Sequence, residues 1–191
     1  MTGPVDETCR DIVEFWMIEA GPSRWYQVDD AFDQRIRDTY QPLWRSAWQG
    51  KFGNWMASAE GALALLLLCD QFPRNMFRGQ AIAFASDPRA RELAREAIAS
   101  GFDLEVAPDA RQFFYLPFEH SEDMEDQLRA VELFTERLPG EGLTHARAHA
   151  ATIAEFGRFP WRNAALGRVS TREEEALLAA GGYAEMLRRI S

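Results

Sequence analysis

Eight consecutive apolar residues, ALALLLLC at positions 62–69, constrain the fold more than any other feature of this 191-residue chain. A helix that is apolar on every side must be buried on every side, because an exposed face would leave apolar surface in water. The run is much shorter than the ~20 residues that a membrane-spanning helix needs. We therefore expect residues 58–71 to form a buried central helix, and we expect no membrane segment.

The rest of the chain shows helical periodicity and no convincing two-residue alternation. Apolar residues at 124, 128, 131, 134 and 138 follow one helix face, for example. A short helix at about 109–115 is expected to end before Pro117, Ser121 to cap the helix at 121–138, and Ser170 with Glu173 to form a capping box. The sequence predicts an all-α fold of about eight helices in antiparallel pairs, forming one domain over residues 1–191.

Composition excludes several classes of function. The chain has 21 Lys+Arg against 30 Asp+Glu, a net charge of −9, and such a surface repels nucleic-acid phosphates. It has 2 cysteines, and its first residues, MTGPVDETCR, lack the apolar core of a signal peptide. We expect a cytoplasmic protein that binds neither nucleic acid nor membrane.

A polar segment, DQFPRNMFRG at 70–79, follows the apolar run. A helix carboxyl end disfavours the charge of Asp70, so we expect Arg74 and Arg78 to compensate it. Pro73 is expected to move Phe72 out of the helical region and to free backbone carbonyls for Arg74 and Asn75. These polar groups either form hydrogen bonds with the backbone groups at the helix end or bind an anion. An arginine guanidinium can bind a carboxylate or phosphate through two parallel hydrogen bonds. The candidate ligand-binding residues here are Asp70, Gln71, Arg74, Asn75 and Arg78.

A similar segment, RFPWRNAALGR, occupies 158–168. It repeats the order Phe-Pro followed by Arg-Asn after a helix end, and it adds Arg158, Arg162 and Asn163 to the candidate ligand-binding residues. The five arginines of the two segments are more than capping alone requires.

The candidate proton-transfer residues are His120, Glu122 and His149. Acids at a helix start are common for structural reasons, and a histidine on an apolar helix face is more often a hydrogen-bonded core residue. His145 and His149 stand four apart on one helix side, which is also a spacing for a metal pair. There is no His-Glu-x-x-His motif and no cysteine pair, so we expect no metal and no cofactor.

The strings DQFPRNMFRG, FFYLPFEHSED, FGRFPWRN and LGRVST together resemble a bacterial family known as domain of unknown function 924. The resemblance covers nearly the whole chain and implies an all-helical, tetratricopeptide-like superhelical fold, without implying an activity. The family's motif matches Asp70, Gln71, Pro73, Arg74, Asn75, Arg78, Gly79, His120, Ser121, Glu122, His149, Phe156, Gly157, Arg158, Pro160, Arg162 and Asn163. The family commonly has histidine where this chain has Trp161, so a histidine role there is not expected.

Three functions fit these residues. The first is a pocket at helix ends that binds a small anionic ligand, with or without a reaction. The second is a scaffold that binds a partner protein or peptide, in which the polar residues are structural. The third is a His/Glu metal-dependent enzyme. The aromatic-rich residues 15–55 are either a groove or homodimer face or, as we favour, ordinary core.

Overall fold

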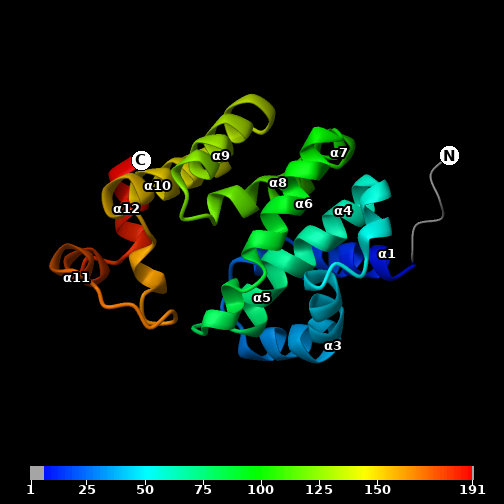
Figure 1. Cartoon of the computed structure of the whole chain (residues 1–191), viewed down its shortest axis with the longest axis horizontal. Helices are drawn as coiled ribbons and strands as arrows, with labels where there is room; N and C mark the ends of the chain where they lie inside the picture. The colour runs from blue at the N-terminus through cyan, green and yellow to red at the C-terminus, as the bar shows by residue number, and fades with distance from the viewer. Residues whose placement is uncertain (1–6, 191) are drawn as a thin grey trace. The chain divides into compact units, whose positions relative to one another are not determined.

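The apolar run lies in a helix that is buried on all sides. The computed structural model describes residues 7–190, and within that range the chain forms helices and no strand (Figure 1). Helix α4, Ala59–Leu66, continues without a break into a π-helical turn, Leu67–Gln71, and then into α5, Phe72–Met76. Every residue from 61 to 73 is buried. The predicted all-α class and the buried central helix are confirmed, whereas the tetratricopeptide-like packing stays a prediction.

Pro73 does not end the helix. Phe72 has helical backbone angles, φ −59° and ψ −39°, and its N–H donates to the carbonyl of Leu67, five residues earlier. The expectation that Phe72 leaves the helical region is therefore wrong. The π-turn accommodates Pro73, so the helix continues past the proline. The carbonyl of Cys69, four residues before Pro73, accepts a hydrogen bond from the Ser86 hydroxyl at 2.6 Å.

The chain separates into two units. One unit consists of the residues up to Arg78 together with Ile82–Pro117, and the other consists of Gly79–Ala81 together with the residues from Phe118 onward. The single domain predicted for residues 1–191 stays a prediction.

The first unit surrounds α4 with helices and aromatic side chains. Its further α-helices are α1 (Glu7–Glu14), α2 (Pro22–Trp25), α3 (Asp30–Trp48), α6 (Asp87–Ala99), α7 (Phe102–Glu105) and the first part of α8 (Pro108–Glu119). A π-turn at Phe15–Ala20, a 3₁₀ turn at Gly53–Ala57 and the 3₁₀ turn at Ala81–Phe84 from Ile82 onward complete it. The buried rings of the aromatic segment are Phe15, Trp16, Trp25, Phe32, Tyr40, Trp44 and Trp55. Only Tyr26 and Trp48 among its rings are exposed, which supports the core interpretation of residues 15–55.

The second unit contains the end of α8, which extends past Pro117 to Glu119 rather than ending before the proline. The side-chain amide of Gln127 donates to the carbonyls of Glu119 and Ser121, at 2.7 and 2.6 Å, so the late helix end is hydrogen-bonded. The helices that follow are α9 (Met124–Arg137), α10 (Glu141–Phe156), α11 (Arg172–Ala179) and α12 (Tyr183–Ile190). Helix α10 packs against both α9 and α12.

The two predicted caps of this unit are each displaced in register. Asp123, not Ser121, caps α9, with its carboxylate accepting from the backbone N–H of Glu125. Thr171 and Glu174, not Ser170 and Glu173, form the capping box of α11. At α11 the neighbouring residues Ser170 and Thr171 have the same capping chemistry, and Arg158 and Asn163 select the observed register by binding Glu174. Across residues 7–190, no helix is long and apolar enough to cross a bilayer.

Gly61 provides a test of how closely α4 packs. A Cβ atom at this position would lie 2.2 Å from the carbonyl oxygen of Trp55, which is backbone and cannot move aside easily. We predict that Gly61→Ala lowers stability by at least the ~1–3 kcal/mol typical of overpacking, despite the better helix propensity of alanine. Gly53→Ala is the matched control, because a Cβ there meets nothing within 4 Å. Thermal unfolding measures both, and equal melting temperatures would contradict the packing.

Candidate functional site

The first polar segment forms a network around Arg74. Its guanidinium binds both carboxylate oxygens of Asp87, at 3.0 and 3.1 Å, and lies 3.2 Å from Asp70 Oδ1. It also donates to the backbone carbonyl of Asp70 at 2.5 Å, which confirms that Arg74 satisfies a carbonyl of this segment. Burial alone would lower the pKa of Arg74, but the charges of Asp70 and Asp87 outweigh it and raise that pKa. Gln71 donates to Asp70 Oδ2 at 2.6 Å.

Asn75 and Arg78 bind a different carboxylate. Asn75 Nδ2 donates to Asp33 Oδ1 at 2.8 Å, and Arg78 binds Asp33 through Nε and, at 3.1 Å, through Nη2. Arg78 also donates to the carbonyl of Gln27. The expected pairing of Arg78 with Asp70 is not among these contacts. Instead, the segment is tied to α3 through Asp33, 6% exposed, and to α6 through Asp87.

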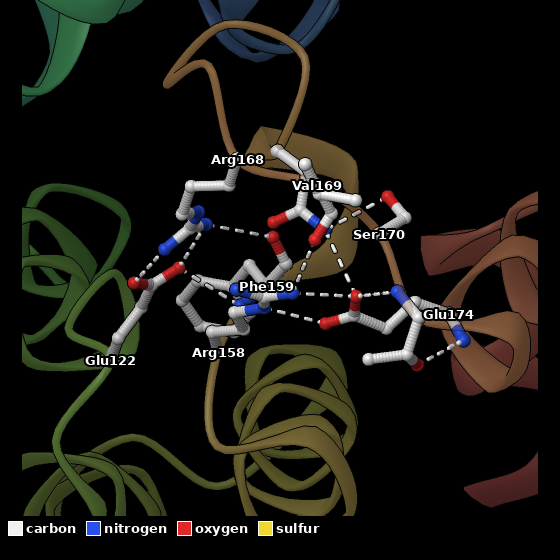
Figure 2. Close-up of polar contacts among 9 residues, drawn as sticks. Glu122, Arg158, Phe159, Arg168, Val169, Ser170 and Glu174 are labelled. Carbon is white, nitrogen blue, oxygen red and sulfur yellow. Dashed lines mark hydrogen bonds and ion pairs between the residues drawn. The ribbon is translucent and has the colours of Figure 1, made fainter.

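The second polar segment is held by Glu174 of α11 (Figure 2). Arg158 donates to both oxygens of this carboxylate, at 2.6 and 2.8 Å. Asn163 Nδ2 and the backbone N–H of Thr171 donate to Oε2, at 3.2 and 2.7 Å. The hydrogen bond from Arg158, with the smaller contributions of Thr171 and Asn163, outweighs burial and lowers the pKa of Glu174 to about 2.

Glu122 holds the same segment from the other side (Figure 2). Its carboxylate accepts from Arg168 Nη1 and Nη2, at 2.7 and 2.9 Å, and from the backbone N–H of Phe159 at 2.9 Å. Burial raises the pKa of Glu122, but the hydrogen bonds from Arg168 and Phe159 produce a net lowering of that pKa. Such a carboxylate is a good anchor and a poor proton acceptor.

The carboxylate that contacts His149 is Glu119. Nδ1 of His149 lies 3.0 Å from Glu119 Oε1 and 3.0 Å from the carbonyl oxygen of His145. Both neighbours are acceptors, so Nδ1 carries the proton, and in the neutral ring Nε2 carries the lone pair. Glu119 is 3% exposed, and its Oε2 has no hydrogen-bond partner among residues 7–190. Within that range, no arginine or lysine pairs with it either.

Aromatic rings surround His149. Its ring centroid lies 4.8 Å from Tyr183, 5.3 Å from Phe159 and 6.1 Å from Trp161. His120 is also near, at 6.4 Å between ring centroids. The guanidinium of Arg162 lies over the Phe159 ring, 4.7 Å from its centroid. We call His149, Glu119, Phe159, Trp161 and Tyr183 the His149 cluster.

The predicted site residues therefore divide between the two units. Of the ligand-binding candidates, the second unit has Arg158, Arg162 and Asn163, and the first has the five residues of the first segment. Sequence reasoning missed Glu119, Tyr183 and the carboxylates of Asp33, Asp87 and Glu174. Glu119 directly precedes His120, but the expected helix end before Pro117 placed it in a loop. Within residues 7–190, no group of three or more His, Cys, Asp or Glu side chains could hold a metal ion.

Asp70 tests the first network. We predict that Asp70→Ala costs more stability than Asp70→Asn, because asparagine keeps one of the two oxygen acceptors that Asp70 presents to Gln71 and Arg74, and alanine keeps neither. Removing one partner of a buried ion pair costs about 3–5 kcal/mol, and we expect the lower end because Asp87 still pairs Arg74. Denaturant unfolding measures the difference, with the exposed Asp38→Ala as control. An alanine variant as stable as the wild type would show that Asp70 does not compensate Arg74.

Glu174 tests the second network through pH. Its folded-state pKa is about 2, below the ordinary 4.5, so its contribution to stability is complete above pH 4.5 and is lost as the pH falls toward 2. We predict that Glu174→Gln is less stable than the wild type at pH 7, with the difference shrinking across that window. Glu173→Gln, an exposed neighbour, should show no such pattern. A pH-independent difference for Glu174→Gln would contradict the charge pairing.

Comparisons with known proteins agree with this picture of the fold. The chain is similar to a protein of unknown function, ATU0120, from Agrobacterium tumefaciens, whose structure superposes with a TM-score of 0.88. The two are 46% identical over 92% of this chain and 98% of that chain. A comparison with curated proteins found no match. A family model described as a bacterial protein of unknown function, DUF924, matches residues 12–182, and the chain belongs to that family.

Proposed function

We propose that the protein binds a small anionic ligand at the His149 cluster and that His149 exchanges a proton with it. The observation that carries this proposal is the pair of Glu119 and His149, 3.0 Å apart. A buried carboxylate on Nδ1 fixes the orientation and tautomer of an imidazole, and it stabilises the imidazolium that forms when Nε2 takes a proton. This is the arrangement of a general base.

The charge of Glu119 supports the same role. The carboxylates of Asp33, Asp87, Glu122 and Glu174 are neutralised by arginines of their own unit. Glu119 is instead paired with an imidazole, so its charge acts on a group that can gain and lose a proton. The rings of Tyr183, Phe159 and Trp161 add favourable contacts to a cationic imidazole. General acid–base catalysis of this kind contributes about 10²–10⁴-fold to a rate.

The anionic character of the ligand is inferred from Arg162. Its guanidinium and the imidazole of His149 each contact the Phe159 ring, so a fixed positive charge and the proton-transfer group belong to the same aromatic cluster. Arg74, Arg78, Arg158 and Arg168 bind carboxylates within their own units, which supports a structural role for those four. Arg162 also acts on a carboxylate, because its charge helps to lower the pKa of Glu122.

The other two functions receive less support. A peptide-binding scaffold would use an exposed apolar groove, yet most rings of residues 15–55 are buried. A metal-dependent enzyme would need a third ligand beside His120 and His149, and Glu122 is bound by Arg168.

The test is a thermal-shift screen of the full chain with small carboxylates, sugar phosphates and inorganic phosphate. A compound at 100 times its Kd stabilises by ~2.7 kcal/mol, which raises the melting temperature of a protein this size by about 5–10 °C. We predict at least one such compound, and that Arg162→Gln abolishes its effect. Arg147→Gln removes an exposed charge from α10 and is the matched control.

Two variants separate binding from proton transfer. Glu119→Gln keeps an acceptor for Nδ1 of His149 but removes the charge, so it should keep ligand binding and lose proton transfer. His149→Gln should lose both. A compound that stabilises the wild type and both Arg162→Gln and His149→Gln equally would place its site elsewhere and contradict the proposal.

A further inference from the structure

Tyr183 lies across one turn of α10. Its ring centroid is 4.8 Å from that of His149, while its hydroxyl forms a hydrogen bond with Nδ1 of His145, one turn earlier on the same helix. The Tyr183 ring also contacts Trp161, with 5.5 Å between the centroids. One phenol thus connects the His149 cluster with a second imidazole.

A glycine pair brings Tyr183 to this position. Gly181 and Gly182 have φ angles of 118° and 60°, which residues with a side chain rarely adopt. The N–H of Gly182 donates to the carbonyl of Leu177 at 2.9 Å, which closes the end of α11. Helix α12 begins at the next residue, Tyr183, and packs on α10.

The direction of the hydrogen bond follows from the surroundings of His145. Nε2 of its ring lies 4.0 Å from Glu141 Oε1, too far for a hydrogen bond, whereas Nδ1 is bonded to the Tyr183 hydroxyl. Because a phenol is a good donor, we assign the proton of the neutral ring to Nε2. Nδ1 then has the lone pair and accepts from the Tyr183 hydroxyl. His145 and His149 are therefore held in opposite tautomers.

The side chains connected through Tyr183 become more exposed to solvent from His149 to His145 and Glu141. The side chain of His149 is 13% exposed, that of His145 is 36% exposed, and that of Glu141 is 93% exposed. Tyr183 joins the least exposed of these groups to the more exposed ones. Among residues 7–190, the charged or titratable groups at the His145 side chain are Glu141 of its own helix and Tyr183 of α12, while His149 contacts its backbone carbonyl.

We propose that Tyr183 and His145 form a second proton-transfer pair, which exchanges protons between a ligand at the His149 cluster and solvent. This inference rests on the proposed function, and it gives the site two proton-transfer groups: His149 with Glu119, and Tyr183 with His145. A proton leaving the ligand binds the Tyr183 oxygen as the phenolic proton passes to Nδ1 of His145. Nε2 of the resulting imidazolium then releases its proton to Glu141 or water, and the reverse sequence protonates the ligand.

The pair has a spectroscopic signature that needs no ligand. In the neutral state Tyr183 donates to His145, and once His145 is protonated its Nδ1–H must donate to Tyr183 instead. We predict that the ¹³Cζ resonance of Tyr183 and the ¹⁵N resonances of His145 change together, with one midpoint, in an NMR titration of the full chain. A tyrosine that only fills space beside His145 would not follow its protonation.

Variants complete the test. In Tyr183→Phe, the ¹⁵Nδ1 resonance of His145 should shift toward that of an imidazole nitrogen that accepts no hydrogen bond. His149 should stay protonated on Nδ1. Tyr26→Phe, which removes a hydroxyl bonded to Gln112, is the control and should change neither histidine. An unchanged His145 spectrum in Tyr183→Phe, or a Tyr183 resonance that ignores His145, would overturn the inference.

The titration also separates the two proposals. If no small anion stabilises the protein but Tyr183 and His145 titrate together, the proposed ligand fails, and only the coupling between Tyr183 and His145 stands. If a compound binds and is turned over, Tyr183→Phe should lower kcat with KM nearly unchanged, because the phenol transfers a proton and does not anchor the anion. A change confined to KM would assign Tyr183 to binding instead.

Discussion

The structure depends on buried carboxylates that are paired with arginines. An isolated charge inside a protein is very costly, so each such carboxylate needs a hydrogen-bonding cation nearby. Asp87 with Arg74, and Asp33 with Arg78, tie α5 to α6 and α3 in the first unit. In the second unit, buried Glu174 with Arg158 and half-buried Glu122 with Arg168 hold residues 158–168, which connect α10 to α11. Removing one partner of a buried pair costs far more free energy than the intact pair contributes to stability. Arrangements that leave one of these groups unpaired are therefore disfavoured, and the pairs specify where helix ends lie.

Local features of this arrangement could be predicted from the sequence. The all-apolar run had to be buried, and the helical periodicity of the other segments predicted the all-α class. The polar residues after the run could also be recognised as a cluster, since a helix end leaves backbone carbonyls and charges that need partners. Arg74 at the Asp70 carbonyl is such a short-range contact.

The partners of the arginines could not be predicted, because they lie far away in the sequence. Asp33 precedes Arg78 by 45 positions, and Glu122 precedes Arg168 by 46. Many acids were available for each arginine, and only tertiary packing selects one. The same packing decides the cap register: Thr171 caps α11 because Glu174 is the acid that Arg158 and Asn163 bind. The helix end after Pro117 was misplaced for a related reason, since Gln127 completes it from α9.

Glu119 differs from the other buried carboxylates in a way that bears on chemistry. A carboxylate bound by arginine has a fixed partner, because guanidinium does not release its proton in proteins. A carboxylate bound by imidazole has a partner that is able to gain and lose a proton. The carboxylates of Asp33, Asp87, Glu122 and Glu174 have arginine partners, whereas Glu119 has His149, in the ring cluster that also contains His120 and Tyr183. The choice of partner thus separates the groups that hold the fold from the group that is able to exchange a proton.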